Sequence, residues 1–343
     1  MTTRLCFTEP AGPRGASHSV VSVPQLPDPS AWPSLRWGII GTGIARAFVR
    51  AVAQNTRQKV TAVTARDEGK TRAFASEFGI SKLHNSVDAL VADPEVDVVY
   101  VATPHTLHRQ QALAAIAAGK HVLIEKPIAM SADEAREITS AGVAAGVLVM
   151  EAMWTRYLPQ ADVIRRVIGE GIIGDVHLVA AGFGFVSTYD LANCLWAPDL
   201  GGGALLDAGI YPISLASSIL GTPSRIEVAG DMGSGGVDVQ ADLLLVNENG
   251  RALASTSITS QLPSTAAISG SEGGITIGAP SSAHRSSRSP EGRHGTESKG
   301  CSSTATLPGP TVESDSRQPH LPPTWQRAGS NRRRIRTQRS SMS

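Results

Sequence analysis

Short apolar runs alternate with longer helical stretches over the first half of the chain. The runs predict buried strands at Arg36–Ile40, Lys59–Val63, Val96–Val101, His121–Ile124 and Val147–Met150. The stretches between them are rich in Ala and charged residues and predict helices at Ala45–Ala53, Glu68–Phe78, Ser86–Ala92, Leu107–Ala118 and Ala132–Ala145. Strands separated by single helices pair in parallel through right-handed crossovers, which place helices on both faces of the sheet. Residues 35–152 are therefore predicted to form an α/β domain with a doubly wound parallel sheet.

This rhythm changes after Glu151. We expect one helix from Pro159, a residue favoured in the first helical turn, to about Ile168, and a second within Gly203–Leu220. An apolar segment separates the two helices at Val176–Val186. Further strand-like segments follow without intervening helices at Ser224–Ala229, Val237–Val246, Arg251–Ile258 and Ala266–Ile277. Residues 153–280 are therefore interpreted as an α+β domain with a mostly antiparallel open sheet.

The two ends of the chain differ in composition from the part between them. Residues 1–34 contain repeated Pro, Ser and Gly without periodicity and are interpreted as a disordered extension. Residues 281–343 hold fourteen Ser, but Leu, Ile, Val, Met and Trp together number only six. This segment has ten Arg and one Lys against four acidic residues, whereas residues 1–280 are mildly acidic. We expect the basic tail to be disordered as well.

Composition and charge argue against several classes of protein. The chain has no run of 18 apolar residues and no signal-peptide pattern, so neither a membrane span nor secretion is expected. Its cysteines, Cys6, Cys194 and Cys301, are far apart, which argues against a disulfide framework or zinc site and favours a cytoplasmic location. No metal is implied, and the acidic main part does not look like a nucleic-acid binder. The basic cluster Arg332–Arg336 leaves nucleic-acid binding as an alternative, without interleaved aromatic residues to support it.

A glycine-rich loop follows the first predicted strand and opens the first helix. Gly41 permits a tight turn, and Gly43 lets the backbone approach a pyrophosphate at the helix N-terminus. The expected cofactor-binding residues of the loop are Gly41, Thr42, Gly43 and Ile44. The third glycine position of the dinucleotide fingerprint is occupied by Arg46, so the motif is incomplete.

The end of the second strand bears on the choice of cofactor. Arg66 follows this strand, where the adenine ribose of a dinucleotide is expected, and an arginine there can pair with a 2′-phosphate. The adjacent Asp67 could instead bind a free 2′-hydroxyl. The pattern favours NADP and leaves NAD open, and the alternative for Arg66 is a solvated loop residue.

Two further segments carry residues suited to proton transfer. Lys126 lies between Glu125 and Pro127 just past a strand end, where parallel sheets place their ligands. Asp207 and Tyr211 are four residues apart, so on a helix they share one face. The alternatives are a surface ion pair for Lys126 and a helix whose Tyr211 only covers the core.

These segments together resemble the Gfo/Idh/MocA family of nicotinamide-dependent oxidoreductases. The resemblance covers residues 35–279 and rests on Gly41-Thr-Gly43, on Val101–His108, on His121–Pro127 and on Gly201–Pro212. The stretch Glu151–Pro159 is similar to the dihydrodiol dehydrogenase and NADP-dependent D-xylose dehydrogenase branch of the family. The family fold is a Rossmann-type domain followed by an α+β domain, as the strand pattern also predicts.

The resemblance assigns roles to the site residues. It implies that Tyr211 donates or accepts the carbinol proton, assisted by Lys126, with Asp207 completing the group. A free tyrosine has a pKa of about 10, and a nearby ammonium would lower it by stabilising the phenolate. The nicotinamide half of the cofactor is expected beside Thr103, Pro104, His105, Glu125 and Pro127. The substrate pocket is expected to be lined by Trp154, Phe183 and Phe185, although such aromatics can equally be core residues.

The resemblance ends near residue 280. Residues 281–343 match nothing in the family pattern, and we hypothesise that the reading frame is shifted there, leaving the second domain incomplete. The expected function is hydride transfer between NADP, or NAD, and a carbinol or carbonyl carbon of a sugar or cyclic trans-dihydrodiol. A homodimer through the second sheet is an expected partner arrangement. The alternatives are a cofactor-binding protein without turnover and a truncated, nonfunctional product.

Overall fold

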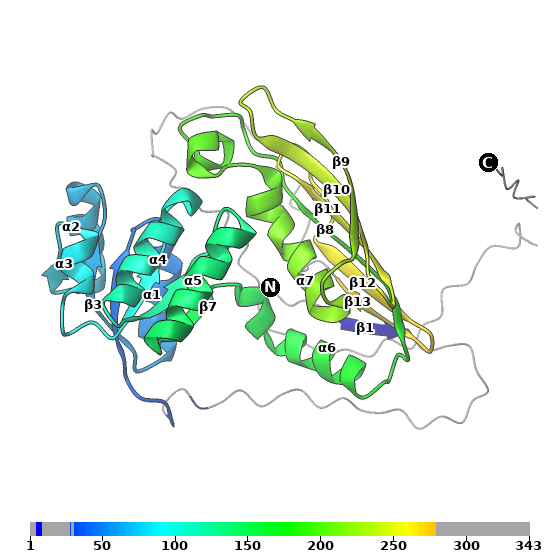
Figure 1. The fold of residues 1–343 in the computed structure, drawn as a ribbon, viewed down its shortest axis with the longest axis horizontal. Coiled ribbons are helices and arrows are strands. Elements are labelled where there is room, and N and C mark those ends of the chain that lie inside the picture. The colour runs from blue at the N-terminus through cyan, green and yellow to red at the C-terminus, as the bar shows by residue number, and fades with distance from the viewer. Residues whose placement is uncertain (1–4, 9–27, 29–30, 279–343) are drawn as a thin grey trace, which may run out of the picture. The chain divides into compact units, whose positions relative to one another are not determined.

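The computed structural model describes residues 5–8, 28 and 31–278, and of residues 5–8 it describes the backbone alone. The described residues form two β-sheets with their covering helices (Figure 1). The predicted tail at 281–343, including the cluster at 332–336, lies outside these residues, as does most of the predicted extension at 1–34.

The first sheet is parallel throughout, as the alternation of strands and helices predicts. Its strand order is β4-β3-β2-β5-β6-β7, and its strands are β2 (Arg36–Ile40), β3 (Lys59–Thr64), β4 (Lys82–Leu83), β5 (Val98–Val101), β6 (His121–Ile124) and β7 (Val149–Glu151). The helices between them are α1 (Ala45–Asn55), α2 (Glu68–Phe78), α3 (Val87–Val91), α4 (His108–Ala117) and α5 (Ala132–Ala145). The two-residue strand β4 is the one element of this sheet that local patterning does not indicate.

Local capping residues set the bounds of these helices. The Asp67 side chain accepts from the N–H of Lys70 at the start of α2, and Ser131 accepts from Glu134 at the start of α5. Both helices end at a glycine in the left-handed conformation, with Gly146 at φ +67° after α5.

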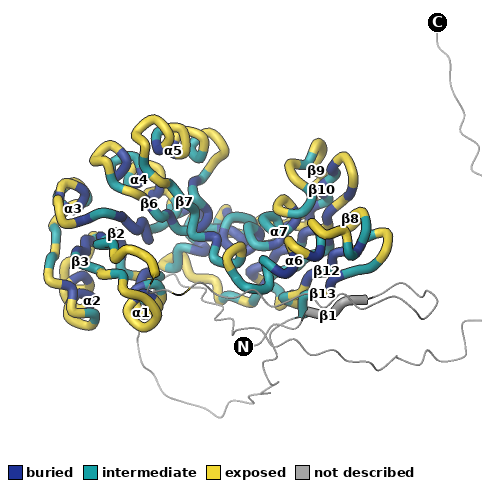
Figure 2. Tube along the Cα trace, turned by 90° about the horizontal axis from the view of Figure 1, so that it is seen from below, coloured by how far each residue is buried: buried dark blue, intermediate teal, exposed yellow. Residues whose placement is uncertain are grey.

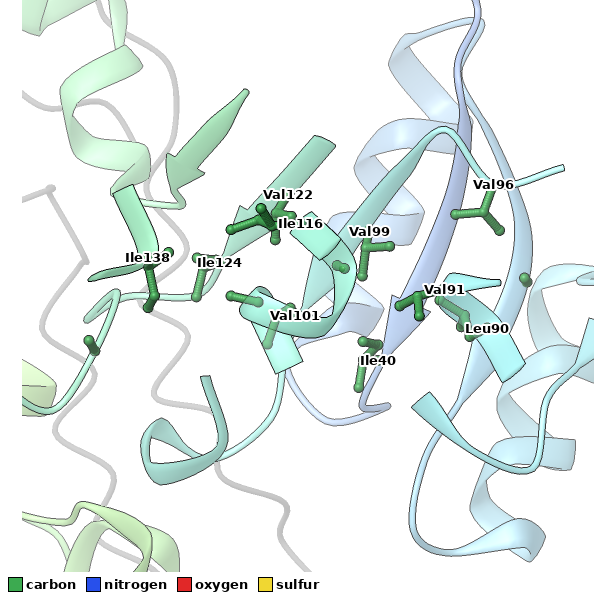
Figure 3. Close-up of a cluster of buried hydrophobic side chains, with 14 residues drawn as sticks. Ile40, Leu90, Val91, Val96, Val99, Val101, Ile116, Val122, Ile124 and Ile138 are labelled. Carbon is green, nitrogen blue, oxygen red and sulfur yellow. The ribbon is translucent and has the colours of Figure 1, made fainter. Parts of the chain in front are cut away.

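Branched aliphatic side chains fill the space between the first sheet and its helices. Figure 3 shows Val99, Val101, Val122 and Ile124 from neighbouring strands facing Ile116 and other helix residues. Ile124 has no exposed surface. Full burial of an aliphatic side chain contributes about 1.5–3 kcal/mol, so this cluster holds the strand ends in place.

The second sheet is mostly antiparallel and has the order β1-β13-β12-β8-β11-β10-β9. Its strands are β1 (Leu5–Thr8), β8 (Val176–Gly184), β9 (Arg225–Met232), β10 (Asp238–Val246), β11 (Arg251–Ser257), β12 (Thr265–Gly270) and β13 (Gly274–Ile277), and β8 pairs with β11 in parallel. Helices α6 (Pro159–Gly169) and α7 (Ile210–Leu220) pack on one face through a shared apolar cluster (Figure 1). Strand β9 is exposed along its length, as Figure 2 shows. The predicted segment Ala266–Ile277 is two strands joined by a tight turn.

Two expectations need correction. Leu5–Thr8, within the segment expected to be disordered, is strand β1 and pairs with β13, a long-range pairing that composition does not reveal. Cys194 is disulfide-bonded, contrary to the expectation from cysteine spacing. The segment Pro198–Leu220 is long and apolar enough to cross a membrane by length and composition. Its second half is α7, which packs on β8 and β11.

An ion pair between Arg36 and Asp97 joins the start of β2 to the turn before β5. The guanidinium donates to both carboxylate oxygens, at 2.9 and 2.6 Å. These hydrogen bonds hold the pKa of Asp97 at about 2, below its ordinary value of 3.8.

We predict that this carboxylate contributes to loss of stability in acid. Because the pKa of Asp97 is lower in the folded chain, its stabilising effect is present above about pH 4 and is lost as the pH falls toward 2. Asp97→Asn should therefore lower the melting temperature at pH 7 and lower it less at pH 3. Asp133→Asn, at a side chain that is 95% exposed, is the control and should change neither value. An equal loss at both pH values for Asp97→Asn would contradict the prediction.

Candidate active site

The turn between β2 and α1 contains two glycines that act differently. Gly41 has φ +97°, and a Cβ there would lie 2.4 Å from the carbonyl oxygen of Ala102, so the turn requires glycine. Its N–H donates to the Thr64 carbonyl at 2.9 Å. A Cβ on Gly43 would meet no atom within 4 Å. Gly41 thus packs the turn against the sheet, and Gly43 leaves open space before α1.

The start of α1 is suited to an anion. Ile44 is its N-cap residue, and no side chain among the described residues caps the helix there. Thr42 lies between the glycines, so the loop presents backbone N–H groups and the positive end of the helix dipole toward the open space. Arg46, which departs from the fingerprint, is turned to α2, where it pairs with Glu77 and lies over the Phe74 ring. These residues fit the pyrophosphate of a dinucleotide.

Arg66 and Asp67 lie in the turn between β3 and α2, and their side chains have different surroundings. The Asp67 carboxylate accepts from the Lys70 N–H at 2.9 Å as the cap of α2. Arg66 is exposed next to it. The arginine is therefore accessible, while the carboxylate is used in capping the helix.

Lys126, at the carboxyl end of β6, forms a buried ion pair with Asp207. Its ammonium donates to Asp207 Oδ1 at 2.9 Å and to the Asp207 carbonyl at 2.8 Å, and the two residues are 9% and 8% exposed. Burial opposes the charge of Lys126, but electrostatic attraction to Asp207, Tyr211 and Glu125 and the hydrogen bond that the ammonium donates to Asp207 raise its pKa above the ordinary value. Lys126 is therefore a cation at neutral pH.

Tyr211 lies within reach of this cation and is surrounded by aromatic rings. The Lys126 ammonium is 5.1 Å from the centroid of the Tyr211 ring. The Trp154 indole N–H donates to the phenol oxygen at 3.3 Å, and the Phe183 ring packs edge-on at 5.3 Å. The Tyr211 ring thus lies near a cation, and its phenol oxygen accepts from an indole N–H.

A cavity of 670 Å³ opens beside Tyr211. Trp154, Phe183 and Tyr211 line one part of it, and α6 and α7 supply apolar side chains such as Ile164 and Leu215. Its size and mainly apolar lining are typical of small-molecule sites. Phe185, also expected to line the pocket, instead contacts Phe183 and packs against the Leu195–Trp196 cluster.

Two histidines hold the loop after β5. His105 Nδ1 lies 3.0 Å from the Gly201 carbonyl oxygen, and burial lowers the pKa of His105 to about 4, so the ring is neutral at pH 7. His108 is fully buried and its ring nitrogens lie 2.9 Å from the carbonyl oxygens of Thr103 and Pro127. Burial lowers the pKa of His108 too, and a neutral ring donates to one of these carbonyls at a time.

The remaining cofactor candidates lie on the same loops. The Thr103 hydroxyl donates to Gln111 at 2.7 Å, and Pro104 precedes the short 3-10 helix His105–Leu107. These residues follow β5, and Pro127 follows β6, the adjacent strand. The structure thus brings this expected group to one edge of the sheet.

Tyr100, which was not among the predicted site residues, is hydrogen-bonded to Glu125. The Tyr100 hydroxyl donates to Glu125 Oε1, and the other carboxylate oxygen accepts from the Lys126 N–H at 3.1 Å. Burial raises the pKa of Glu125 and of Tyr100, and the hydrogen bond with Tyr100 partly offsets the effect on Glu125. Tyr100 interrupts an otherwise all-valine strand, Val98–Val101, and this break in the pattern was the available signal.

Two family models match most of the described part of the chain. Residues 35–153 match an oxidoreductase family with an NAD-binding Rossmann fold, and residues 162–276 match the Gfo/Idh/MocA C-terminal domain.

Curated relatives share this organisation. A trans-1,2-dihydrobenzene-1,2-diol dehydrogenase of Mus musculus is 39% identical over 248 residues, which is 70% of this chain and 73% of the relative. The enzyme of the same name from Homo sapiens is 36% identical over 253 residues, covering 71% and 74% of the two chains.

Solved structures of similar fold include a 3-ketoreductase from Actinomadura kijaniata in complex with NADP and TDP-benzene. It has a TM-score of 0.64 and 29% identity, with 72% of this chain and 78% of that chain covered. An aldose-aldose oxidoreductase from Caulobacter crescentus has a TM-score of 0.66 at 24% identity, covering 71% and 76%. Together with the parallel sheet, the glycine loop and the second sheet, these matches establish that the chain belongs to the Gfo/Idh/MocA oxidoreductase family.

Proposed function

We propose that the chain is an NADP-preferring oxidoreductase that transfers a hydride between nicotinamide and the carbinol or carbonyl carbon of a sugar or cyclic trans-dihydrodiol. The observation that carries the proposal is the group formed by Lys126, Asp207 and Tyr211, of which Tyr211 lines the cavity. The names of the diol dehydrogenases and of the 3-ketoreductase support the substrate class. In this proposal residues 35–152 form the cofactor domain and residues 153–280 the substrate domain.

Binding of the dinucleotide is assigned to the loop before α1 and to the ends of the central strands. The pyrophosphate would be held by backbone N–H groups of Gly41–Ile44, and Arg66 would pair with a 2′-phosphate. Thr103, Pro104, His105, Glu125 and Pro127 would surround the nicotinamide half. When bound, the nicotinamide supplies the hydride acceptor or donor.

Proton transfer is assigned to Tyr211. In the oxidative direction the phenol oxygen takes the proton of the substrate hydroxyl, and in the reductive direction it returns that proton to the carbonyl oxygen. The Lys126 ammonium stabilises the negative charge on that oxygen, and Asp207 keeps the ammonium charged and in place. The Trp154 indole N–H orients the phenol, and Trp154 and Phe183 exclude water from the reacting carbon.

Removing the phenol oxygen should abolish most of the activity. Tyr211→Phe keeps the ring contacts with Phe183 and Trp154 and removes the proton carrier, so kcat should fall by about 10²–10⁴-fold. Tyr157→Phe, at an exposed tyrosine that does not line the cavity, is the matched control. The measurement is NADP⁺ reduction with a panel of sugars and cyclic diols. Unchanged kcat in Tyr211→Phe, with a substrate that the unaltered chain oxidises, would remove Tyr211 from the mechanism.

Cofactor preference can be tested by thermal melting. NADP⁺ at about 100 times its dissociation constant should stabilise the folded chain by roughly 2.7 kcal/mol, a shift of several degrees. NAD⁺ at the same concentration should give a smaller shift. Arg66→Ala should weaken NADP⁺ binding about tenfold, or about 1.4 kcal/mol, and leave NAD⁺ binding unchanged.

Arg136→Ala provides the control, because Arg136 is exposed on α5 and pairs with Asp133. It should retain both shifts. Equal shifts with NADP⁺ and NAD⁺ in the unaltered chain would contradict the assignment of Arg66.

A homodimer through the second sheet is also part of the proposal. The face opposite α6 and α7 exposes Leu253 at 48% and Leu178 at 36%, and Leu244 is the cross-strand partner of Leu253. Apolar side chains on a sheet face that none of the described helices covers are typical of contact surfaces.

Light scattering after size exclusion should give twice the 35.8 kDa chain mass. Leu253→Lys should shift the mass to that of one chain, whereas Val143→Lys, at an exposed valine on α5, should leave the dimer intact. A single-chain mass for the unaltered protein would exclude the dimer.

A further inference from the structure

Asp238, at the start of β10, contacts the segment that leads to Asp207. Its Oδ2 accepts from the Leu205 N–H at 2.6 Å. Leu205 begins a five-residue π-helix, Leu205–Gly209, which contains Asp207 and continues into α7 with Tyr211. A hydrogen bond to a carboxylate is roughly twice as strong as one between neutral groups, so it is well suited to setting the start of this turn.

The glycine two residues earlier makes room for this carboxylate. Gly203 has φ +124°, and a Cβ there would lie 2.1 Å from Asp238 Oδ1. The backbone conformation strains any other residue, and a Cβ there would displace the Asp238 carboxylate. The Gly201–Gly203 run therefore includes one glycine whose absence of a side chain is needed for the approach of Asp238.

An irregularity in the sheet accounts for the direction of the Asp238 side chain. The register between β9 and β10 shifts between Asp238 and Gln240. A β-bulge of this kind redirects a side chain at the end of a strand and is common beside active sites. Beyond the bulge, pairing of β10 with β9 is regular.

Two other elements hold the same segment. The Thr256 hydroxyl, from β11, donates to the Ala204 carbonyl at 3.3 Å, and His105 contacts the Gly201 carbonyl. Asp238 differs from them in binding the first N–H of the π-helix itself. The π-helical register is uncommon and is frequent at functional sites. A π-helical carbonyl pairs with the N–H five residues further on, and for Asp207 that residue is Pro212, which has no N–H. The Asp207 carbonyl accepts from Lys126 instead.

We infer that Asp238 is a positioning residue that holds the Leu205–Gly209 π-helix so that Asp207 meets Lys126, a role that rests on the function proposed above for Lys126 and Tyr211. It acts through Asp207 and does not touch the reacting atoms. Loss of the Asp238 carboxylate leaves the Leu205 N–H without this acceptor. We expect the first turn of the π-helix to open more often as a result.

The test compares Asp238→Ala and Asp238→Asn with Asp242→Asn in the full chain. Asp242 lies four residues further on β10 and is exposed, so it is the matched control. Amide hydrogen exchange of the 203–211 segment and labelling of Lys126 by an amine-reactive reagent are both followed by mass spectrometry. In Asp238→Ala the rate of amide exchange and the rate of Lys126 labelling should each rise about tenfold. In Asp238→Asn, which keeps an oxygen acceptor, both rates should stay close to those of the unaltered chain. Asp242→Asn should behave as the unaltered chain.

Activity provides the second readout. With a substrate that the unaltered chain oxidises, Asp238→Ala should lower kcat about tenfold and leave the cofactor-induced melting shift in place. Combined with Asp207→Asn, it should lower kcat little further, because both changes act on one interaction. Unchanged exchange and labelling, or full additivity with Asp207→Asn, would overturn the inference. Absence of turnover in the unaltered chain would instead refute the proposed function, since exchange and labelling require neither substrate nor cofactor.

Discussion

The buried pair of Lys126 and Asp207 is the interaction on which the rest of the site depends. It joins the carboxyl end of β6, in the parallel sheet, to the π-helix that leads into α7 over the second sheet. Taking two charges out of water is costly, and the cost is offset only when geometry and further hydrogen bonds are good. Here the ammonium has both a carboxylate and a carbonyl oxygen within 2.9 Å. Either charge alone would be unfavourable at this depth, so the end of β6 and the π-helix must each supply one.

The surroundings of this pair are arranged to keep it dry and oriented. Glu125 precedes Lys126 and accepts a hydrogen bond from the hydroxyl of Tyr100, which lies on the adjacent strand β5. His105 and His108 are neutral at pH 7 because burial lowers the pKa of both, so they add hydrogen bonds without adding a second positive charge near the ammonium. Among the described residues, Lys126 is thus the one that places a positive charge over the Tyr211 ring.

Local patterning was sufficient for the first sheet apart from β4, but not for every contact around the site. The runs at Arg36–Ile40 and His121–Ile124 were predicted with the bounds that the structure shows, because a buried parallel strand is a continuous apolar run. Strand β1 was missed because it exists only through pairing with β13, which lies far away in sequence. Phe185 was expected in the pocket from the family resemblance. Residues two apart, such as Phe183 and Phe185, point to the same side only while the strand stays regular, and Phe185 follows the end of β8.

The sequence by itself determined the order of strands and helices, the glycine loop before α1, and the identity of Lys126, Asp207 and Tyr211 as candidate residues, because these depend on local spacing and residue chemistry. Only the tertiary structure decided that Arg46 turns to α2, that Asp67 caps a helix beside an exposed Arg66, and that Tyr100 and Asp238 support the site. Lys126 and Asp207 are 81 residues apart, and Leu205 and Asp238 are 33 apart. Contacts over such separations follow from how the sheets and helices pack, which no local pattern encodes.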